Sequence, residues 1–496
     1  MFKMVKYFAF SLCIASLVLQ GCSKKELVDL YPEFNLDALA NPSNIKQVED
    51  VLLGAYAAFR NANYFGSGSG TGSGWAIMPD VLSDNLYETL QTLSNSRAMA
   101  DWLYQPNTAQ VATLYAAPYG VIANANIVLR DIDKFTTSAN QLLANRLKGQ
   151  AYAMRAMAHF DLMRYFAVKY DRNSTTDLAL YYSTQFIVQP NVRPARMSNK
   201  QYYDSIFNDL SKATTLLGNV DAPINPVTGL TRPYIDLPVI NALLARIYLY
   251  AGMWPEAIAA ATRVINDRPL VNLDQAAFSG MYNQTSRGEI IWNVQFETGQ
   301  QGPTFLAYFA TNGRSYFRPA LEIATVAGTT GLIRSNDIRY SAFFTTMSGE
   351  QSLTKFRGKG TVTDGSTNFP VFRTGEMYLI RAEARARNAQ EGPALDDLNA
   401  LRAARINGYI PVTGVTGALL LEAIANERRR ELVGEGHRFF DLKRTTRTIT
   451  RGSTCGNQAI SPAGDCQLNP TDREWTLPIP ESVRNANENA QQNPDY

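Results

Sequence analysis

The sequence has little cysteine, almost no histidine and no strong charge of one sign. Its 496 residues include 4 Cys and 2 His. So few nitrogen and sulfur ligands argue against a metal centre, and we expect neither a metal nor another cofactor. Lys and Arg number 47 against 44 Asp and Glu, a net charge of +3. Because no basic run with interleaved aromatic residues departs from this balance, nucleic acid is not an expected partner.

Motifs of common enzyme classes are also missing. The chain contains no Gly-x-Ser-x-Gly elbow, phosphate-cradling loop or His-rich metal motif. Asp80, Asp84 and Glu88 recur at four-residue intervals and could place carboxylates on one helix face. Glycoside hydrolysis needs a carboxylate pair, but a solvated acidic face has the same spacing. We therefore assign no catalytic residue and keep a surface glycoside hydrolase as the minor alternative.

A short apolar run follows two lysines at the N-terminus. Lys3 and Lys6 precede Tyr7 to Leu19, which is too short to span a bilayer, and the run ends in Leu19-Gln-Gly-Cys22. This pattern predicts a lipoprotein signal peptide over residues 1–21 and acylation of Cys22. The alternative is an ordinary secretory signal with an incidental cysteine. Acyl chains contribute about 0.8 kcal/mol per buried methylene, so membrane lipid is an expected partner.

Two cysteines remain once Cys13 has left with the signal and Cys22 carries lipid. Cys455 and Cys466 lie in a Gly/Ser/Pro-rich stretch. In an oxidising exterior this spacing predicts one disulfide that closes the loop between them.

Helical periodicity dominates much of the chain. Apolar residues at three- and four-residue intervals predict helices near 44–60, from 114 onward, and over 140–169. His159 lies beside the apolar stripe of the third, which favours a hydrogen-bonded core histidine. Small residues and aromatics over 245–269 match a tetratricopeptide repeat, and 382–405 is a weaker copy. Since no long charged or Pro-rich linker divides the chain, we expect residues 22–496 to form one body.

The charged stretch from Asn426 to Arg444 has guanidinium and carboxylate groups on a partly apolar helix. Arg428 shares a helical stripe with Ile424 and Leu432, so carboxylates must meet it if it is buried. We predict a structural ion cluster rather than a catalytic acid/base site. Its expected members are Glu427, Arg428, Glu431, Glu435, Arg438 and Asp441.

The same stretch carries a family resemblance. Its pattern E-R-x-x-E-x-x-x-E-G-x-R-x-x-D-L resembles the C-terminal signature of the SusD/RagB family, outer-membrane nutrient-binding lipoproteins of Bacteroidetes. Blocks at 148–162, 372–384 and 477–496 resemble that family too. The resemblance implies a mainly α fold: a tetratricopeptide-like helical-repeat scaffold with a large irregular loop-rich half and a few short strands. It also implies an N-terminal region over 22–220 and a C-terminal RagB/SusD region over 270–496.

The resemblance further implies a location and a partner. Relatives are anchored by lipid in the outer membrane, and we expect this chain to face the cell exterior. They sit on a SusC-like TonB-dependent transporter and pass an oligosaccharide to it, or an oligopeptide in the RagB-like branch. A repeat scaffold that binds only another protein is a further alternative.

Long loop stretches rich in aromatic and amide residues supply candidate ligand contacts. Sugars present C–H patches and hydroxyl groups, which aromatic faces flanked by polar groups bind well. The loops contain more aromatic and amide groups than charge, which favours a glycan over a peptide. The candidate ligand-binding residues are Trp75, Asp80, Asn85, Tyr87, Trp102, Tyr104, Phe305, Tyr308, Arg314 and Tyr316.

Overall fold

The computed structural model describes residues 40–66, 74–92, 96–186, 191–220, 223–225, 229–297, 300, 302, 315–347, 349–461 and 464–496. The chain divides into two compact units, residues 1–43 and 44–496, and the description below concerns the second. The predicted signal peptide and Cys22 lie outside the described residues. The predicted boundary at residue 22 therefore stays a prediction.

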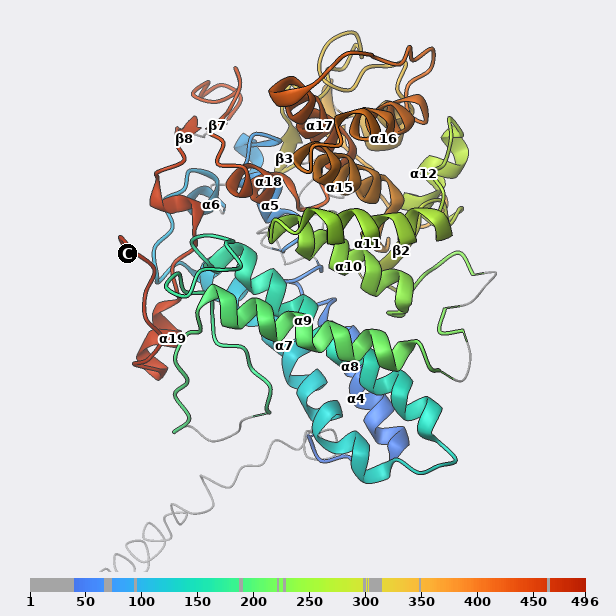
Figure 1. The fold of residues 1–496 in the computed structure, drawn as a ribbon. Helices are drawn as coiled ribbons and strands as arrows, with labels where there is room; N and C mark the ends of the chain where they lie inside the picture. Colours follow the sequence, from blue (N-terminus) through green and yellow to red (C-terminus); the bar gives the residue numbers. More distant parts are fainter. Residues whose placement is uncertain are drawn as a thin grey trace, which may run out of the picture. The chain divides into compact units, whose positions relative to one another are not determined.

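Four helices pack together in the N-terminal part of the unit (Figure 1). They are α4 (Ile45–Ala58), α7 (Ala109–Asp131), α8 (Gln141–Phe166) and α9 (Asn199–Leu217). The Asn44 side chain caps α4 by accepting a hydrogen bond from the Gln47 backbone N–H at 3.0 Å. Alanines along the buried α8 let its neighbours approach closely, so α8 lies against α7, α9 and α4. The three predicted N-terminal helices are confirmed.

Helix α7 and the 3-10 helix η2 (Ile132–Phe135) are together long and apolar enough to cross a membrane. Over half of its most apolar window is nevertheless buried within the fold, where α7 packs against α4 and α8. This burial explains its composition, because a helix that is hydrophobic nearly all round fits a protein core as well as a bilayer.

Two further helix pairs match the predicted repeats. Helices α10 (Leu237–Tyr250) and α11 (Trp254–Asp267) form the first pair, and α15 (Thr374–Arg387) and α16 (Glu391–Ala403) form the second. Gly252 turns the chain between α10 and α11 with a φ of 69°, a left-handed conformation that glycine adopts without strain. Helix α11 packs against α15, so the pairs are neighbours, as stacked repeats require.

The helix that carries the charged stretch ends shortly before two glycines. Helix α17 (Gly417–Leu432) is separated from α18 (Arg438–Arg444) by Gly434 and Gly436, which have φ angles of 76° and 77°. A side chain at either position would strain the backbone. The turn between them brings α18 back against α5 (Met78–Val81).

Strands are few and short, as expected for the loop-rich half. Each sheet in the described residues is an antiparallel pair. The pairs are β1 (Leu86–Glu88) with β3 (Phe317–Pro319), β2 (Ile290–Val294) with β6 (Phe369–Arg373), β4 (Phe344–Met347) with β5 (Glu350–Leu353), and β7 (Ile449–Thr450) with β8 (Gln467–Leu468). The remaining elements are η1 (Leu90–Thr92), α6 (Arg97–Ala100), α12 (Gln275–Asn283), α14 (Ile338–Phe343), η3 (Arg473–Trp475) and α19 (Glu481–Ala486).

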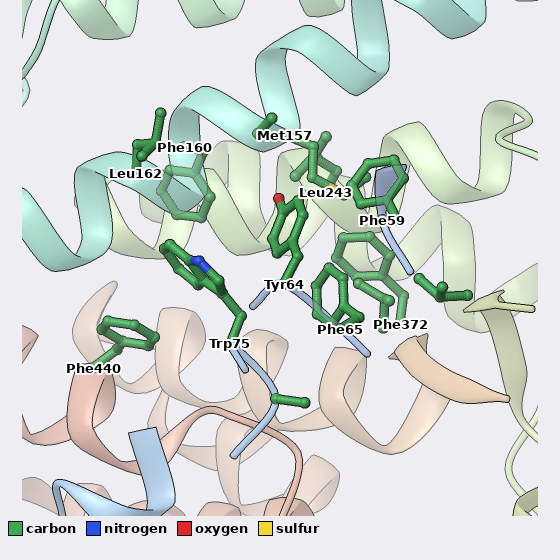
Figure 2. Close-up of a cluster of buried hydrophobic side chains, with 14 of the residues drawn as sticks. Phe59, Tyr64, Phe65, Trp75, Met157, Phe160, Leu162, Leu243, Phe372 and Phe440 are labelled. Atoms are coloured by element: carbon green, nitrogen blue, oxygen red, sulfur yellow. The ribbon is translucent and has the colours of Figure 1, made fainter. Parts of the chain in front are cut away.

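One hydrophobic core joins the helical part to the loop-rich part. Figure 2 shows Trp75 between Phe440 and Tyr64, with Phe160 and Leu162 of α8 nearby. The Trp75 ring centroid lies 4.3 Å from that of Tyr165, edge to face. The indole Nε1–H donates to the Leu114 carbonyl at 3.3 Å, so the polar atom of this buried ring is satisfied. The segment that begins at Trp75 is therefore anchored in the core.

Candidate functional site

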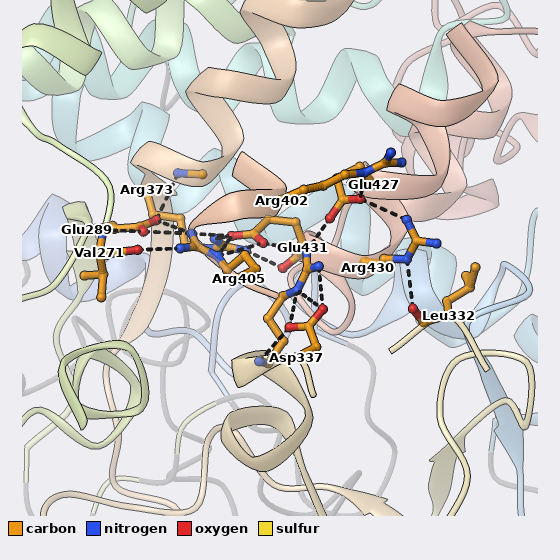
Figure 3. Close-up of polar contacts among 12 residues, drawn as sticks. Val271, Glu289, Leu332, Asp337, Arg373, Arg402, Arg405, Glu427, Arg430 and Glu431 are labelled. Carbon is orange, nitrogen blue, oxygen red and sulfur yellow. Dashed lines mark hydrogen bonds and ion pairs between the residues drawn. The ribbon is translucent and has the colours of Figure 1, made fainter. Parts of the chain in front are cut away.

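A buried ion cluster centres on Glu431 of α17 (Figure 3). Its carboxylate accepts from Arg405 Nη2 at 2.9 Å, from Arg339 Nη1 at 2.9 Å and from Arg373 Nη1. All four side chains are at most 1% exposed. Gly375 makes room for this arrangement, since a Cβ there would lie 2.4 Å from Glu431 Oε1.

Carboxylates around this centre balance the three arginines. Glu289 pairs with Arg405 at 2.7 Å, and Asp337 pairs with Arg339 at 2.7 Å. Glu427 pairs with Arg339, Arg402 and Arg430, whereas Glu435 pairs with Arg373 and Lys355. Each buried charge in this list therefore has an opposite charge within hydrogen-bond distance, which is the condition for tolerating charges in a protein interior.

The electrostatics of the cluster indicate a structural role. Burial opposes ionisation of Glu431, but Arg405, Arg373 and Arg339 outweigh it and hold its pKa well below the ordinary value. The pKa of Glu427 is lowered to about 2, where burial is again outweighed by Arg339, Arg430 and Arg402. A general acid or base needs a pKa near the operating pH, and these carboxylates stay ionised. Glu427, Glu431 and Glu435 are paired in one buried ion cluster, and the structural role of that cluster stays a prediction.

The other predicted members belong to separate clusters. Arg428 pairs with Asp441 at 3.0 Å, and Asp441 also pairs with Arg444, which continues to Glu383. Arg438 pairs with Asp84 at 2.7 Å. Of the carboxylates near Arg428 in the chain, Asp441 pairs with it, whereas Glu427, Glu431 and Glu435 pair with other cations. Glu427 and Glu431 lie one helical turn apart on one face of α17, and that face is turned toward arginines contributed by distant segments.

Asp80 and Asn85 hold the turn between α17 and α18. The Asp80 carboxylate accepts from the backbone N–H of Gly434 at 3.1 Å and of Gly436 at 3.0 Å. It also accepts from Asn85 Nδ2 at 2.7 Å, and Asn85 Oδ1 accepts from Arg429 Nε at 2.9 Å. Burial raises the pKa of Asp80 to about 6. Both side chains are at most 1% exposed, so their predicted role as ligand contacts is wrong and their role is structural.

The carboxylates with four-residue spacing do not share a helix face. Asp80 lies in α5, Asp84 follows that helix, and Glu88 lies in β1. Asp84 is engaged by Arg438 and Arg429, and their charges lower its pKa despite its burial. The chain turns into a strand before a second helical turn can form, so the expectation of one acidic helix face was wrong.

Three predicted aromatic contacts are buried. Trp75, Trp102 and Tyr104 are 2%, 5% and 0% exposed. Trp102 donates its Nε1–H to the Leu82 carbonyl at 2.9 Å, and the Arg451 guanidinium lies 3.9 Å from its ring centroid. The Tyr104 hydroxyl donates to the Glu474 carbonyl. These rings are packed and hydrogen-bonded inside the protein, so they are not ligand platforms.

The two stretches with candidate aromatics do meet, at the ribbon formed by β1 and β3. Tyr87 stands opposite Arg318, and the Thr89 backbone N–H donates to the Tyr316 carbonyl at 2.9 Å. Gln91 Oε1 accepts from the Ser315 backbone N–H at 2.7 Å. Tyr87 is 8% exposed, whereas Tyr316 is half-buried. Phe305, Tyr308 and Arg314 lie outside the described residues.

A disulfide loop joins this ribbon. Cys455 and Cys466 are bonded, which confirms the predicted pair. The loop is held by the Asp101 carboxylate, which accepts from the Gly464 backbone N–H at 3.3 Å, and by Glu322, which accepts from the Ser453 N–H at 3.3 Å. We use the term loop face for residues 86–92, 315–322 and the described parts of 449–468. It is the place where the predicted ligand segments are brought together.

His159 is a core residue, as predicted. Its Nε2 accepts from the Ser183 backbone N–H at 3.1 Å, so the proton of the neutral ring lies on Nδ1, which is 2.9 Å from the Tyr202 hydroxyl oxygen. In the described part of the chain, no group of three or more His, Cys, Asp or Glu side chains is arranged to hold a metal ion.

The arginines of the ion cluster were missed by the sequence interpretation. Arg339, Arg373 and Arg405 come from three distant segments, and local charge spacing could not connect them. One signal was available for Arg373, which lies in the block 372–384 that resembles the family's strand-to-helix entry. Arg373 ends a strand of otherwise apolar residues, and an arginine in such a place needs a buried partner.

Known proteins share both the sequence pattern and the fold. A model described as starch-binding and associating with the outer membrane matches residues 76–249, and a model of the SusD family matches residues 289–496. A SusD-like protein from Formosa agariphila is 23% identical over 501 residues, which covers 89% of this chain and 91% of the relative.

Solved structures from Bacteroides vulgatus have the same fold. One, a putative sugar binding protein, superposes with a TM-score of 0.75 at 22% identity, covering 91% of this chain and 99% of its own. Another, a SusD superfamily protein, has a TM-score of 0.74 at 23% identity, with the same coverage. With two models of one family matching successive parts of the chain, and with this shared fold, the protein belongs to the SusD/RagB family.

Proposed function

We propose that the protein is a cell-surface lipoprotein that binds oligosaccharides and delivers them to a SusC-like TonB-dependent transporter. The observation that carries this proposal is the loop face, where the half-buried Tyr316 directly follows Ser315, whose backbone bonds the Gln91 amide and the Thr89 hydroxyl. An aromatic ring flanked by such groups suits a sugar, which offers C–H patches and hydroxyls together.

The family gives independent support for this cargo and location. The matching family model is described as starch-binding and associating with the outer membrane, and one structural neighbour is described as a SusD-like carbohydrate binding protein. In our proposal residues 1–21 are the signal peptide, Cys22 carries the lipid, and the body formed by residues 22–496 faces the exterior. Within it, residues 22–220 and 270–496 form the N- and C-terminal regions.

Binding without cleavage is part of the proposal. Two of the three carboxylates considered for glycoside hydrolysis are already engaged, since Asp84 pairs with arginines and Asp80 accepts from two backbone N–H groups. A retaining or inverting hydrolase needs two carboxyl groups that both reach the glycosidic bond. A hydrolase would therefore have to use other residues.

A second candidate cargo is an oligopeptide. The ribbons β1–β3 and β4–β5 are isolated two-stranded pairs, so each has outer edges that could pair with an extended peptide backbone. The sugar is favoured because the loop face combines an aromatic ring with amide and hydroxyl groups, whereas backbone pairing needs no such ring.

Glycan and peptide arrays with the purified protein distinguish the two cargoes. We expect oligosaccharide binding, and we expect Tyr316→Ala to weaken it about tenfold, since a stacked ring contributes about 1 kcal/mol or more. Tyr248→Ala is the matched control, because Tyr248 is a half-buried tyrosine on α10 in the helical repeat. Peptide binding alone, or release of new reducing ends from a bound glycan, would contradict the proposal.

A further inference from the structure

A cleft of about 550 Å³ lies where the ends of three helices meet the C-terminal segment. It is lined by residues that follow α8, by the turn between α10 and α11, by the end of α18, and by residues 470–473, 475–476 and 493–495. No lining residue belongs to the loop face. Its volume falls within the range of about 300–1,000 Å³ that is typical of small-molecule sites.

Lys443 is the distinctive group in this cleft. Its ammonium donates to the Ala167 carbonyl at 2.7 Å and approaches the Arg164 carbonyl at 3.4 Å, both at the end of α8. It also lies 5.1 Å from the centroid of the Tyr170 ring, which lines the cleft as well. An ammonium has three N–H donors, and these two carbonyls use two of them.

No negative side chain among the described residues forms an ion pair with Lys443. Burial lowers its pKa to about 7, and no neighbouring charge counters that effect. The adjacent Arg444 is different, because Glu383 and Asp441 both pair with it. Lys443 is half-buried, and a partly desolvated cation that only neutral carbonyls meet is stabilised when an anion joins it.

The rest of the lining suits an organic molecule rather than an inorganic ion. Tyr170, Tyr250 and Trp475 contribute aromatic surface, and Thr446, Thr476 and Asn493 contribute polar groups. The charged lining has four cations, Lys169, Lys443, Arg444 and Arg473, against three carboxylates, Asp171, Asp472 and Asp495. Aromatic walls favour a carbon skeleton, and the hydroxyl and amide groups can hydrogen-bond to it.

We propose that this cleft binds a small organic carboxylate, whose oxygen accepts the remaining N–H of Lys443. This site lies outside the loop face and does not depend on the proposed oligosaccharide function. Two kinds of molecule carry such a group in this setting: an acidic sugar and the free C-terminus of a short peptide. Both molecules offer a carboxylate, and the experiment below distinguishes an acidic sugar from a peptide C-terminus.

Calorimetry on the detergent-solubilised full chain tests the proposal with matched ligand pairs. Glucuronate is compared with glucose, and dialanine with dialanine amide, so that each pair differs in the carboxylate. We expect the charged member of at least one pair to bind ten or more times more tightly than its neutral partner. A preference within the sugar pair identifies acidic sugars, and one within the peptide pair identifies peptide termini. Equal binding within both pairs, or no binding, overturns the proposal.

Variants of Lys443 and of a neighbouring residue test whether the carboxylate binds at Lys443. We expect Lys443→Met to lose at least tenfold in affinity, whereas Lys134→Met, at a mostly exposed lysine of η2, should bind as the native protein does. Unchanged affinity in Lys443→Met overturns the proposal.

Because Lys443 also caps α8, its replacement could disturb folding, so a second pair of variants leaves Lys443 in place. Thr446 is exposed, lines the cleft, and donates its backbone N–H to the Lys443 carbonyl at 3.1 Å. Thr446→Glu should repel the carboxylate, and the neutral Thr446→Gln should not. Equal affinity of these two variants also overturns the proposal.

Discussion

Arg405 and Glu431 meet at 2.9 Å in the interior of the protein, although 26 residues separate them in the chain. Both are fully buried, and Glu289 and Arg339 extend the pairing on either side. The contact ties α17 to the residues that follow α16 and to the start of β2. The ion cluster therefore joins the last repeat pair to the loop-rich part of the unit.

We expect Glu431→Gln to lower the free energy of unfolding by roughly 3–5 kcal/mol, because three buried guanidinium groups lose their shared carboxylate. Chemical denaturation measures this change. The control is Glu422→Gln on the same helix, since Glu422 is half exposed and pairs with Arg447 at the surface. That change should cost less than about 1 kcal/mol. Equal losses in the two variants would show that the cluster contributes no more than a surface pair.

The buried His159 side chain should make the free energy of unfolding depend on pH. Burial lowers its pKa in the folded protein to about 3, below the unfolded value of 6.5. The unfolded chain then binds more protons between these values, so this residue makes stability fall as the pH falls from 6.5. The loss approaches about 1.4 kcal/mol per pH unit.

The variant His159→Gln cannot take up that proton. The difference in unfolding free energy between the native protein and this variant should therefore shrink steadily from pH 6.5 to pH 4.5. Asp80, whose raised pKa acts in the opposite direction, is present in both proteins and cancels in the difference. A difference that stays constant over this range would mean that His159 is protonated in the folded protein.

Trp75 supports the fold rather than a ligand, so Trp75→Ala should destabilise the protein by roughly 3–5 kcal/mol. The removed ring leaves a cavity among Tyr64, Tyr165 and Phe440. Thermal unfolding reports the loss, with Leu419→Ala as a control at a 74% exposed position. An unchanged melting temperature together with weakened glycan binding would restore Trp75 as a ligand contact.

Cys22→Ala tests the predicted anchor. Without the thiol no diacylglycerol can be attached, so we expect the protein to leave the membrane fraction and to lose palmitate labelling. Cell fractionation and labelling measure the two effects. Cys455→Ala serves as the control, since that cysteine forms the disulfide and should not affect acylation. Labelling that persists in Cys22→Ala would disprove the lipid site.

Local patterns were enough to predict the helical frame. Three features could be read from neighbouring residues alone. They are the apolar stripe of α8, the small residues that let α10 and α11 pack closely, and the glycines at 434 and 436. The disulfide was predictable because only two cysteines remained for the folded body. The charged stretch from Asn426 to Arg444 also identified three carboxylates of the ion cluster, Glu427, Glu431 and Glu435, but not Glu289 or Asp337.

The sequence did not predict which residues surround the aromatic and charged side chains. Trp75 and Trp102 stand among glycines and polar residues, which suggested exposed rings, yet α8, α18 and Arg451 cover them in the fold. The arginines that meet Glu431 come from segments far apart in the chain. A residue's periodicity is local and can be read along the chain, whereas its burial and its charge partners depend on which distant segments fold against it. The sequence alone therefore determined the helices, the family and the disulfide, and the tertiary structure decided which charged and aromatic side chains are enclosed.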